Sequence, residues 1–154
     1  MKKKPEKLWV VIADGEHARV VTPAPAKQFA TALALDSAAA HKRSADLASD
    51  RPGRTHESAS TTRHAIQPRH DPHELAEQAF VREVAHQLDE HAASGEFDRL
   101  VLVAPARALN GLRAAMGAQT QARIAGTLAK DLVKVPDHAL FAHLENWWEA
   151  PGAD

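Results

Sequence analysis

Short apolar runs separated by turn-forming residues dominate the beginning of the chain. Residues 8–13 form an unbroken apolar run rich in β-branched side chains, which Asp14-Gly15 ends. This pattern predicts a buried strand followed by a turn. A second strand is predicted at 17–22, broken by the prolines after it, and the short connection predicts an antiparallel hairpin. A third strand is expected at 29–35, although its many alanines are also compatible with a helix.

Apolar periodicity stops in the next segment. The stretch 49–63 has no apolar residue larger than alanine, so it buries too little surface to offset the entropy of ordering. We therefore expect one α/β domain at 8–148 that contains a long polar loop at about 37–70. Residues 1–7 are expected to form a basic tail, and residues 149–154 a second tail.

Helix signals begin again at residue 71. Asp71 suits a helix N-cap, Pro72 suits the first helical position, and Glu74 stands where a capping box puts its carboxylate. Gly95 is typical of a residue that ends a helix. Between these signals, apolar side chains recur on one face with charges opposite. They are Leu75, Phe80, Val81, Val84, Leu88 and Ala92.

The last third of the chain is predicted to alternate strands and helices. Residues 100–104 are wholly apolar and stop at Pro105, as in a strand buried on both faces. The elements expected after it are a helix with Leu109, Leu112 and Met116, a short helix at 119–124, a strand at 126–135, and a final helix from Pro136 through Trp148. The order β-β-β-loop-α-β-α-β-α predicts a mixed central sheet with helices on its faces.

Composition narrows the possible functions. The chain has 154 residues, with 19 basic and 20 acidic side chains and a formal net charge of −1. Global attraction to nucleic acid or to an anionic membrane is therefore excluded, whereas a local basic patch is not. The lack of cysteine excludes disulfides and thiolate zinc sites. The apolar run at 8–13 is too short for a signal peptide or a membrane span, so we expect a cytoplasmic protein without membrane insertion.

Histidines gather around the predicted helix start. His64, His70 and His73 lie near Asp71, and zinc accepts nitrogen and carboxylate ligands. However, Asp71 is better explained as a helix cap, and Pro72 interrupts the spacing. Solvated surface histidines are the favoured interpretation, so neither a metal nor another cofactor is expected.

Carboxylates near strand ends are a second candidate for chemistry. Asp14, Asp98 and Asp131 could hold Mg²⁺ if they converged on one point. Yet Asp14 belongs to a turn and Asp98 precedes its strand, so the spacing does not predict convergence. We therefore do not expect an enzyme, and a metal-dependent nuclease is the alternative.

The polar loop is a third candidate. Arginines outnumber acids there, and their forked donors suit contacts with phosphate. The alternative is a solvated linker whose arginines serve solubility. The charged residues compared are Arg51, Arg54, Arg63 and Arg69 against Asp50 and Glu57.

Outside the loop, the adjacent Trp147 and Trp148 are a possible dimer contact, because neighbours on one helix cannot both face one core. The oligomeric state itself is not readable from the sequence.

Four strings of residues together resemble the bacterial host attachment protein family. The resemblance runs over roughly residues 8–144, and includes the turn at Asp14 and Gly15. The strings are Trp9-Val10-Val11-Ile12-Ala13-Asp14-Gly15, Ser49-Asp50-Arg51-Pro52-Gly53-Arg54, Phe97-Asp98-Arg99-Leu100-Val101-Leu102-Val103-Ala104-Pro105, and Lys130-Asp131-Leu132 with Val135-Pro136. That family is similar to the middle domain of archaeal and eukaryotic peptide-chain release factors and of Pelota. The resemblance implies an α/β, ribonuclease H-like mixed sheet.

In release factors, the corresponding loop carries a Gly-Gly-Gln tip that enters the peptidyl-transferase centre. Here Pro52-Gly53-Arg54 stands in that loop, and Gln67 has no preceding glycines. Proline fixes its own φ, and Arg54 adds a permanent cation, so hydrolysis of peptidyl-tRNA is not expected.

The resemblance therefore implies a non-catalytic module that binds RNA or the ribosome through this loop. The residues expected to take part are Asp50, Arg51, Pro52, Gly53, Arg54, Arg63 and Arg69. The alternative implied by the family name is a protein-interaction or regulatory factor that influences bacterial attachment to host cells.

Overall fold

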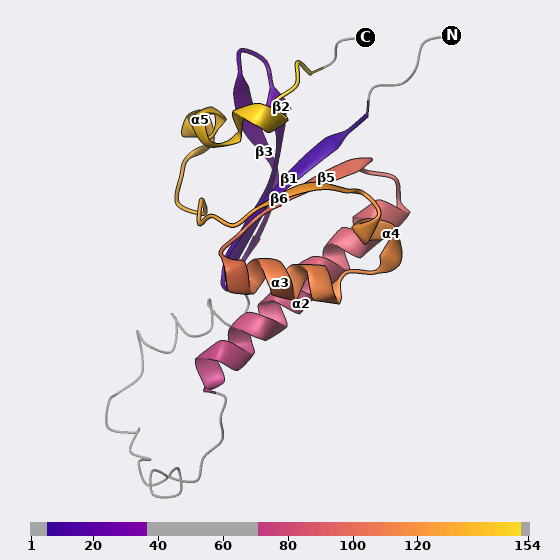
Figure 1. Ribbon diagram of the computed structural model, residues 1–154, viewed down its shortest axis with the longest axis vertical. Helices are drawn as coiled ribbons and strands as arrows, with labels where there is room; N and C mark the ends of the chain where they lie inside the picture. The colour runs from indigo at the N-terminus through magenta and orange to yellow at the C-terminus, as the bar shows by residue number, and fades with distance from the viewer. Residues whose placement is uncertain (1–5, 37–70, 152–154) are drawn as a thin grey trace, which may run out of the picture.

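A five-stranded mixed sheet forms the centre of the molecule (Figure 1). The computed structural model describes residues 6–36 and 71–151. The strand order is β3-β2-β1-β5-β6, in which β2 runs antiparallel to β1 and β3, whereas β1, β5 and β6 are parallel. The strands are β1 (Leu8–Ala13), β2 (His17–Ala24), β3 (Gln28–Asp36), β5 (Arg99–Val103) and β6 (Ile124–Leu128). The predicted α/β class and mixed sheet are thus confirmed.

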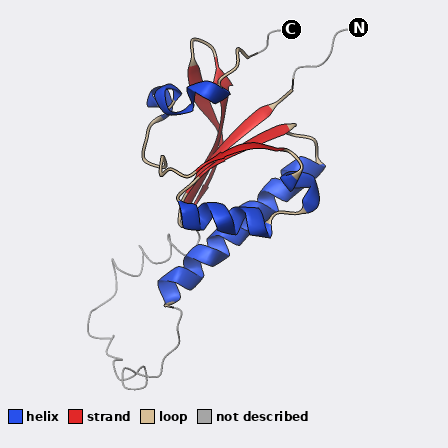
Figure 2. Ribbon diagram, viewed as in Figure 1, coloured by secondary structure: helices blue, strands red, loops and turns tan. Residues whose placement is uncertain are grey.

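Helices cover both faces of this sheet, with unequal regularity (Figure 2). The helices α2 (Pro72–Ala93) and α3 (Ala106–Ala115) pack on one face, and the single turn α4 (Ala118–Gln121) follows α3. The other face is covered by the chain after β6. That cover contains only short pieces, namely η3 (Asp137–Ala139), α5 (Phe141–Leu144) and η4 (Glu145–Trp147).

The strand β1 contributes to two separate hydrophobic cores. Trp9 and Val11 pack toward α2 and α3, whereas Val10 and Ile12 pack toward the C-terminal segment. All six residues of β1 are buried. Because neighbouring side chains of a strand point to opposite faces, burial on both faces requires an unbroken apolar sequence.

The strand β2 is longer than predicted, because it continues through Pro23 to Ala24. The pairing of β1 with β2 reaches only as far as Val10 and Val21, and beyond that point β2 has only β3 beside it. Pro23 therefore lies where β2 is an edge strand, a position that tolerates a residue without an N–H group. Ala26 and Lys27, with φ of 66° and 57°, turn the chain into β3.

The predicted start and end of α2 are confirmed. The carboxylate of Asp71 accepts a hydrogen bond from the Glu74 backbone N–H at 2.9 Å, and Gly95 ends the helix region with φ of 72°. Two details differ from the prediction. The Glu74 carboxylate contacts Arg107 on α3 instead of completing a capping box, and Leu75 is 49% exposed rather than part of the apolar face.

The segment after β5 departs most from the prediction. The short helix ends at Gln121, and β6 occupies Ile124–Leu128 rather than 126–135. Leu132 is buried although no strand contains it. In this irregular segment the guanidinium of Arg19 donates hydrogen bonds to the carbonyl oxygens of Val133 and Val135. These two carbonyl groups are thus paired by a side chain rather than by a neighbouring strand.

The prediction of one continuous final helix is also wrong, because this segment is divided into η3, α5 and η4. The last turn stops at Trp147, and Trp148 has an extended backbone with ψ of 137°. Both tryptophans are half-buried and pack against the same core. The helical argument for opposite orientations therefore does not apply, because the helix ends between them.

Candidate functional site

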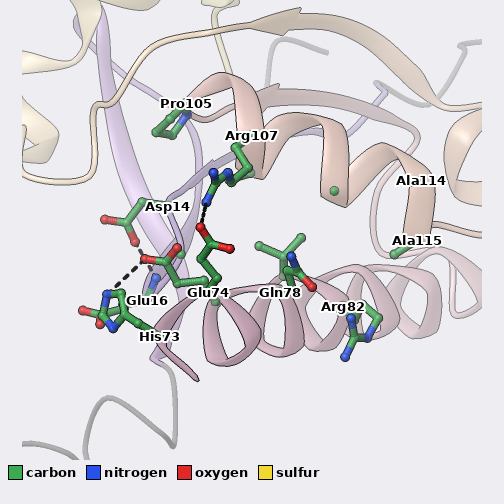
Figure 3. A pocket seen from close by; sticks show the side chains of 15 residues that line it. Asp14, Glu16, His73, Glu74, Gln78, Arg82, Pro105, Arg107, Ala114 and Ala115 are labelled. Carbon is green, nitrogen blue, oxygen red and sulfur yellow. Dashed lines mark hydrogen bonds and ion pairs between the residues drawn. The ribbon is translucent and has the colours of Figure 1, made fainter. Parts of the chain in front are cut away.

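A groove opens at the edge of the sheet where β1 and β5 have their carboxyl ends (Figure 3). Its walls are the turn after β1, the first half of α2, and α3, which begins after Pro105. The volume is about 670 Å³, within the range of small-ligand pockets. Crevices at the carboxyl ends of parallel strands are common ligand sites in α/β folds. We refer to this cavity as the α2–α3 groove.

The groove has an apolar floor made mostly of small side chains. Gly111 allows α3 to pack closely on α2, since a Cβ atom there would lie 3.0 Å from Cγ1 of Val81. The small residues of α3 recur at helical spacing, so they share one face. The apolar lining consists of Val81, Pro105, Ala108, Gly111, Ala114 and Ala115.

The turn after β1 forms one end of the groove. Oδ1 of Asp14 accepts hydrogen bonds from the backbone N–H groups of Glu16 and His17, at 2.8 and 2.7 Å. A Cβ atom on Gly15 would lie 2.7 Å from Cγ of Glu77 on α2. Glycine at this position therefore allows the turn to pack directly on the helix.

Carboxylates are concentrated at this end (Figure 3). Oε2 of Glu74 accepts a hydrogen bond from Arg107 at 3.4 Å, and Oε2 of Glu77 lies 3.5 Å from Nε2 of His73. Asp14, Glu74 and Glu77 each use one oxygen in these contacts. Among residues 6–36 and 71–151, none forms a hydrogen bond with the second oxygen of these three groups. Each carboxylate therefore retains acceptor capacity.

The other end of the groove is less acidic. Gln78 and Arg82 belong to α2 farther along the helix, and Ala114 and Ala115 line the groove from α3 (Figure 3). Arg82 is exposed and forms no ion pair with any other residue in the described part of the chain. The groove is thus asymmetric in charge along α2.

The loop residues predicted to bind RNA lie outside the described residues. These are Asp50, Arg51, Pro52, Gly53, Arg54, Arg63 and Arg69, and the candidate ligands His64 and His70 are also outside. The points of attachment are described. Asp36 at the end of β3 pairs with His17, which follows the turn at the groove, and α2 begins at Pro72.

The three acids considered for a nuclease are not gathered at one point. Asp14 follows the carboxyl end of β1, whereas Asp98 precedes β5 at the opposite edge and accepts a hydrogen bond from the Lys7 backbone. Asp131 lies in the segment after β6. His73 pairs with Glu77, and Asp71 caps α2. Within the described residues, no three His, Asp or Glu side chains could hold a metal ion together.

Sequence reasoning identified the turn at Asp14 and Gly15 but missed the α2–α3 groove. A signal for it was present in the small residues Ala108, Gly111 and Ala115, which fall on one face of α3. The pairing of that face with the acidic beginning of α2 depends on tertiary packing. No local sequence pattern reports such packing.

Comparison with known proteins places the chain in a family. A search of curated proteins gave no match. None of the helices in the described ranges is long and apolar enough to cross a membrane. A family model described as "Protein required for attachment to host cells" matches residues 9–144, from β1 to the end of α5. Because this match covers most of the sequence, the chain belongs to the host attachment family.

Proposed function

We propose that this protein is a non-catalytic, cytoplasmic binding module, and that it serves host attachment through a partner rather than through chemistry. The observation that carries this proposal is the composition of the α2–α3 groove. Among the described residues, those that line the groove include no serine, threonine, cysteine or lysine. Asp14, Glu74 and Glu77 are each held by contacts within the fold. Covalent catalysis by a hydroxyl, thiol or amine nucleophile therefore has no candidate among the described lining residues.

The partner that we propose first is RNA or the ribosome, bound by a release-factor-like module of ribonuclease H-like fold. Support comes from the strand order with β2 alone reversed, and from the arginines between β3 and α2. The α2–α3 groove is lined by more carboxylates than arginines, so phosphates would be contacted by the arginine-bearing segment. Without a Gly-Gly-Gln tip, the module binds and does not hydrolyse.

Sedimentation of the full-length protein in sucrose gradients of cell lysate tests this partner. We expect migration with ribosomal particles at low salt and release at high salt, because phosphate contacts weaken as salt rises. The double variant Arg51→Ala/Arg54→Ala should remain at the top of the gradient. Lys130→Ala/Lys134→Ala is the matched control, since it removes the same charge from exposed positions in another segment. Wild-type protein that stays at the top at both salt concentrations would contradict the proposal.

A protein partner is the second candidate, favoured by the α2–α3 groove itself. Its volume of about 670 Å³ and its apolar floor are suited to a side chain of another protein. Treatment of the sedimenting complex with ribonuclease separates the two candidates. A complex that depends on RNA should dissociate after this treatment, whereas a complex with a protein should still sediment.

A further inference from the structure

We infer that the α2–α3 groove binds an arginine side chain presented by a partner protein. The aliphatic part of the arginine lies on the apolar floor, and its guanidinium group contacts the carboxylates at the end near the β1–β2 turn. This inference goes beyond the proposed RNA partner and holds whether or not the chain binds RNA.

The apolar floor selects a ligand with an apolar stem. Val81 is buried on the α2 side, and Ala108 and Gly111 line the α3 side with little side-chain volume. A three-carbon stem such as that of arginine covers apolar surface while its charged head stays at a polar rim. Small inorganic cations gain nothing from such a floor.

The acidic end selects a cationic head with several donors. Asp14, Glu74 and Glu77 each retain one carboxylate oxygen without a hydrogen bond from another described residue. Arg107 is the nearby compensating cation, and it already contacts Glu74. Counted over the described residues, the end near the turn therefore has an excess of negative charge, which is complementary to a cation.

Guanidinium fits this combination better than ammonium. It carries five N–H donors in a planar arrangement. It is also more weakly hydrated than ammonium, so it loses less hydration free energy when it approaches an apolar surface. The residues of α2 that line the groove run from His73 to Arg82, about 13 Å along the helix axis. This length accommodates one extended arginine side chain together with its peptide backbone.

The test uses two probes that differ only in charge and in donors. N-acetyl-arginine amide is titrated into ¹⁵N-labelled full-length protein and followed by chemical shift, with N-acetyl-citrulline amide as the neutral isostere. We expect shifts at the amides of Gly15 and Gly111 with the arginine probe, weakened by added salt. The citrulline probe should bind at least about threefold more weakly, as expected for loss of screened ion pairs.

Two variants locate the site. Glu74→Gln/Glu77→Gln should weaken arginine binding about two- to fivefold for each charge removed. Glu83→Gln/Glu90→Gln is its matched control, because these glutamates are exposed on α2 and do not line the groove. Ala114→Leu, at an exposed lining position, should obstruct the groove and weaken binding without any change of charge.

Equal binding of both probes would overturn the inference, because it would indicate an apolar site without charge selection. Shifts confined to residues away from the groove would also overturn it. So would equal weakening by the Glu74/Glu77 and Glu83/Glu90 variants, which would indicate attraction to α2 as a whole. A failure of ribosome binding leaves these outcomes unchanged, so the two proposals fail separately.

Discussion

The two faces of the sheet are covered in different ways. On one face, α2 and α3 satisfy most of their backbone groups by their own helical hydrogen bonds. On the other, residues 129–151 form only short helical pieces. There, side chains bond to backbone groups that regular structure would have paired. Trp148, for example, donates from Nε1 to the carbonyl oxygens of Ala24 and Gln28, at 2.9 Å each.

Arg19 is the centre of this irregular cover. Its guanidinium donates to the carbonyls of Val133 and Val135 and contacts the Asp137 carboxylate at 3.2 Å. The second oxygen of Asp137 accepts hydrogen bonds from the backbone and hydroxyl of Thr31.

Polar side chains also join elements on the helical face, where Arg123 donates to the carbonyl oxygens of Ala92 and Phe97. The comparison teaches that the two faces differ in the regularity of their helices, because long helices pair their own backbone groups and the short pieces depend more on side chains. The α2–α3 groove lies on the helical face.

The largest expected effects come from one buried leucine on each face. Leu112 on α3 and Leu140 after η3 are both 0% exposed. Replacement of either by alanine should lower the free energy of unfolding by about 2–5 kcal/mol, through lost burial and a cavity. Urea denaturation followed by circular dichroism measures both losses.

The exposed Leu75 provides the control for this pair, because Leu75→Ala should change the stability by less than about 0.5 kcal/mol. If Leu140→Ala lowered the free energy of unfolding as little as Leu75→Ala, the C-terminal cover would contribute little to stability. The two faces would then not form one cooperative unit.

Arg19→Ala should give the next largest loss, about 2–3 kcal/mol, because hydrogen bonds with a charged partner are lost and acceptors are left half-buried. Hydrogen exchange should accelerate in residues 131–148 and stay slow in α2. The exposed Arg113→Ala on α3 is the control. Uniform acceleration across both faces would show that Arg19 does not act locally.

Asp71→Ala addresses the helical face and should cost about 1 kcal/mol, because the first turn of α2 loses its cap. The measurement is thermal unfolding together with the amide shift of Glu74. Asp71→Asn, which keeps a capping oxygen, should restore most of the stability. An Asp71→Ala protein as stable as the wild type would contradict this role of the cap.

Trp148→Phe should have an effect similar to that of Asp71→Ala, about 0.5–1.5 kcal/mol, because it keeps an aromatic ring but removes the N–H donor. Amide shifts at Ala24 and Gln28 should report the change. Phe141→Leu is a useful comparison, since it alters the ring that packs against Trp148 without touching the donor. Equal shifts in both variants would indicate that packing alone matters.

The difference between the faces also explains what the sequence could predict. The strand β1 and the helix α2 follow from local signals, since β1 is buried on both sides and α2 has its cap at Asp71. The segment after β6 could not be predicted in the same way. Leu128 and Leu132 suggested one strand, but beyond Leu128 the chain leaves the sheet, and its carbonyls bond to Arg19, which is more than a hundred residues away in the sequence.

The candidate site shows the same division. Asp14 and Gly15 could be assigned to a turn from the sequence alone, because aspartate and glycine are typical turn residues. The contact of Gly15 with Glu77 and the approach of Gly111 to Val81 could not be predicted, because each joins two elements that are distant in the sequence. These contacts shape the groove.

The parallel pairing of β1 with β5 has a kinetic consequence. It joins Val10 to Val101, whereas the hairpins β1–β2 and β2–β3 are local. Chains with many long-range pairings fold slowly, because the entropy of loop closure is lost before the stabilising long-range contacts form. We expect the three-stranded meander to form first and β5 to dock in the rate-limiting step. Removing half of residues 37–70 should accelerate that step less than about twofold, since closure entropy varies only logarithmically with length.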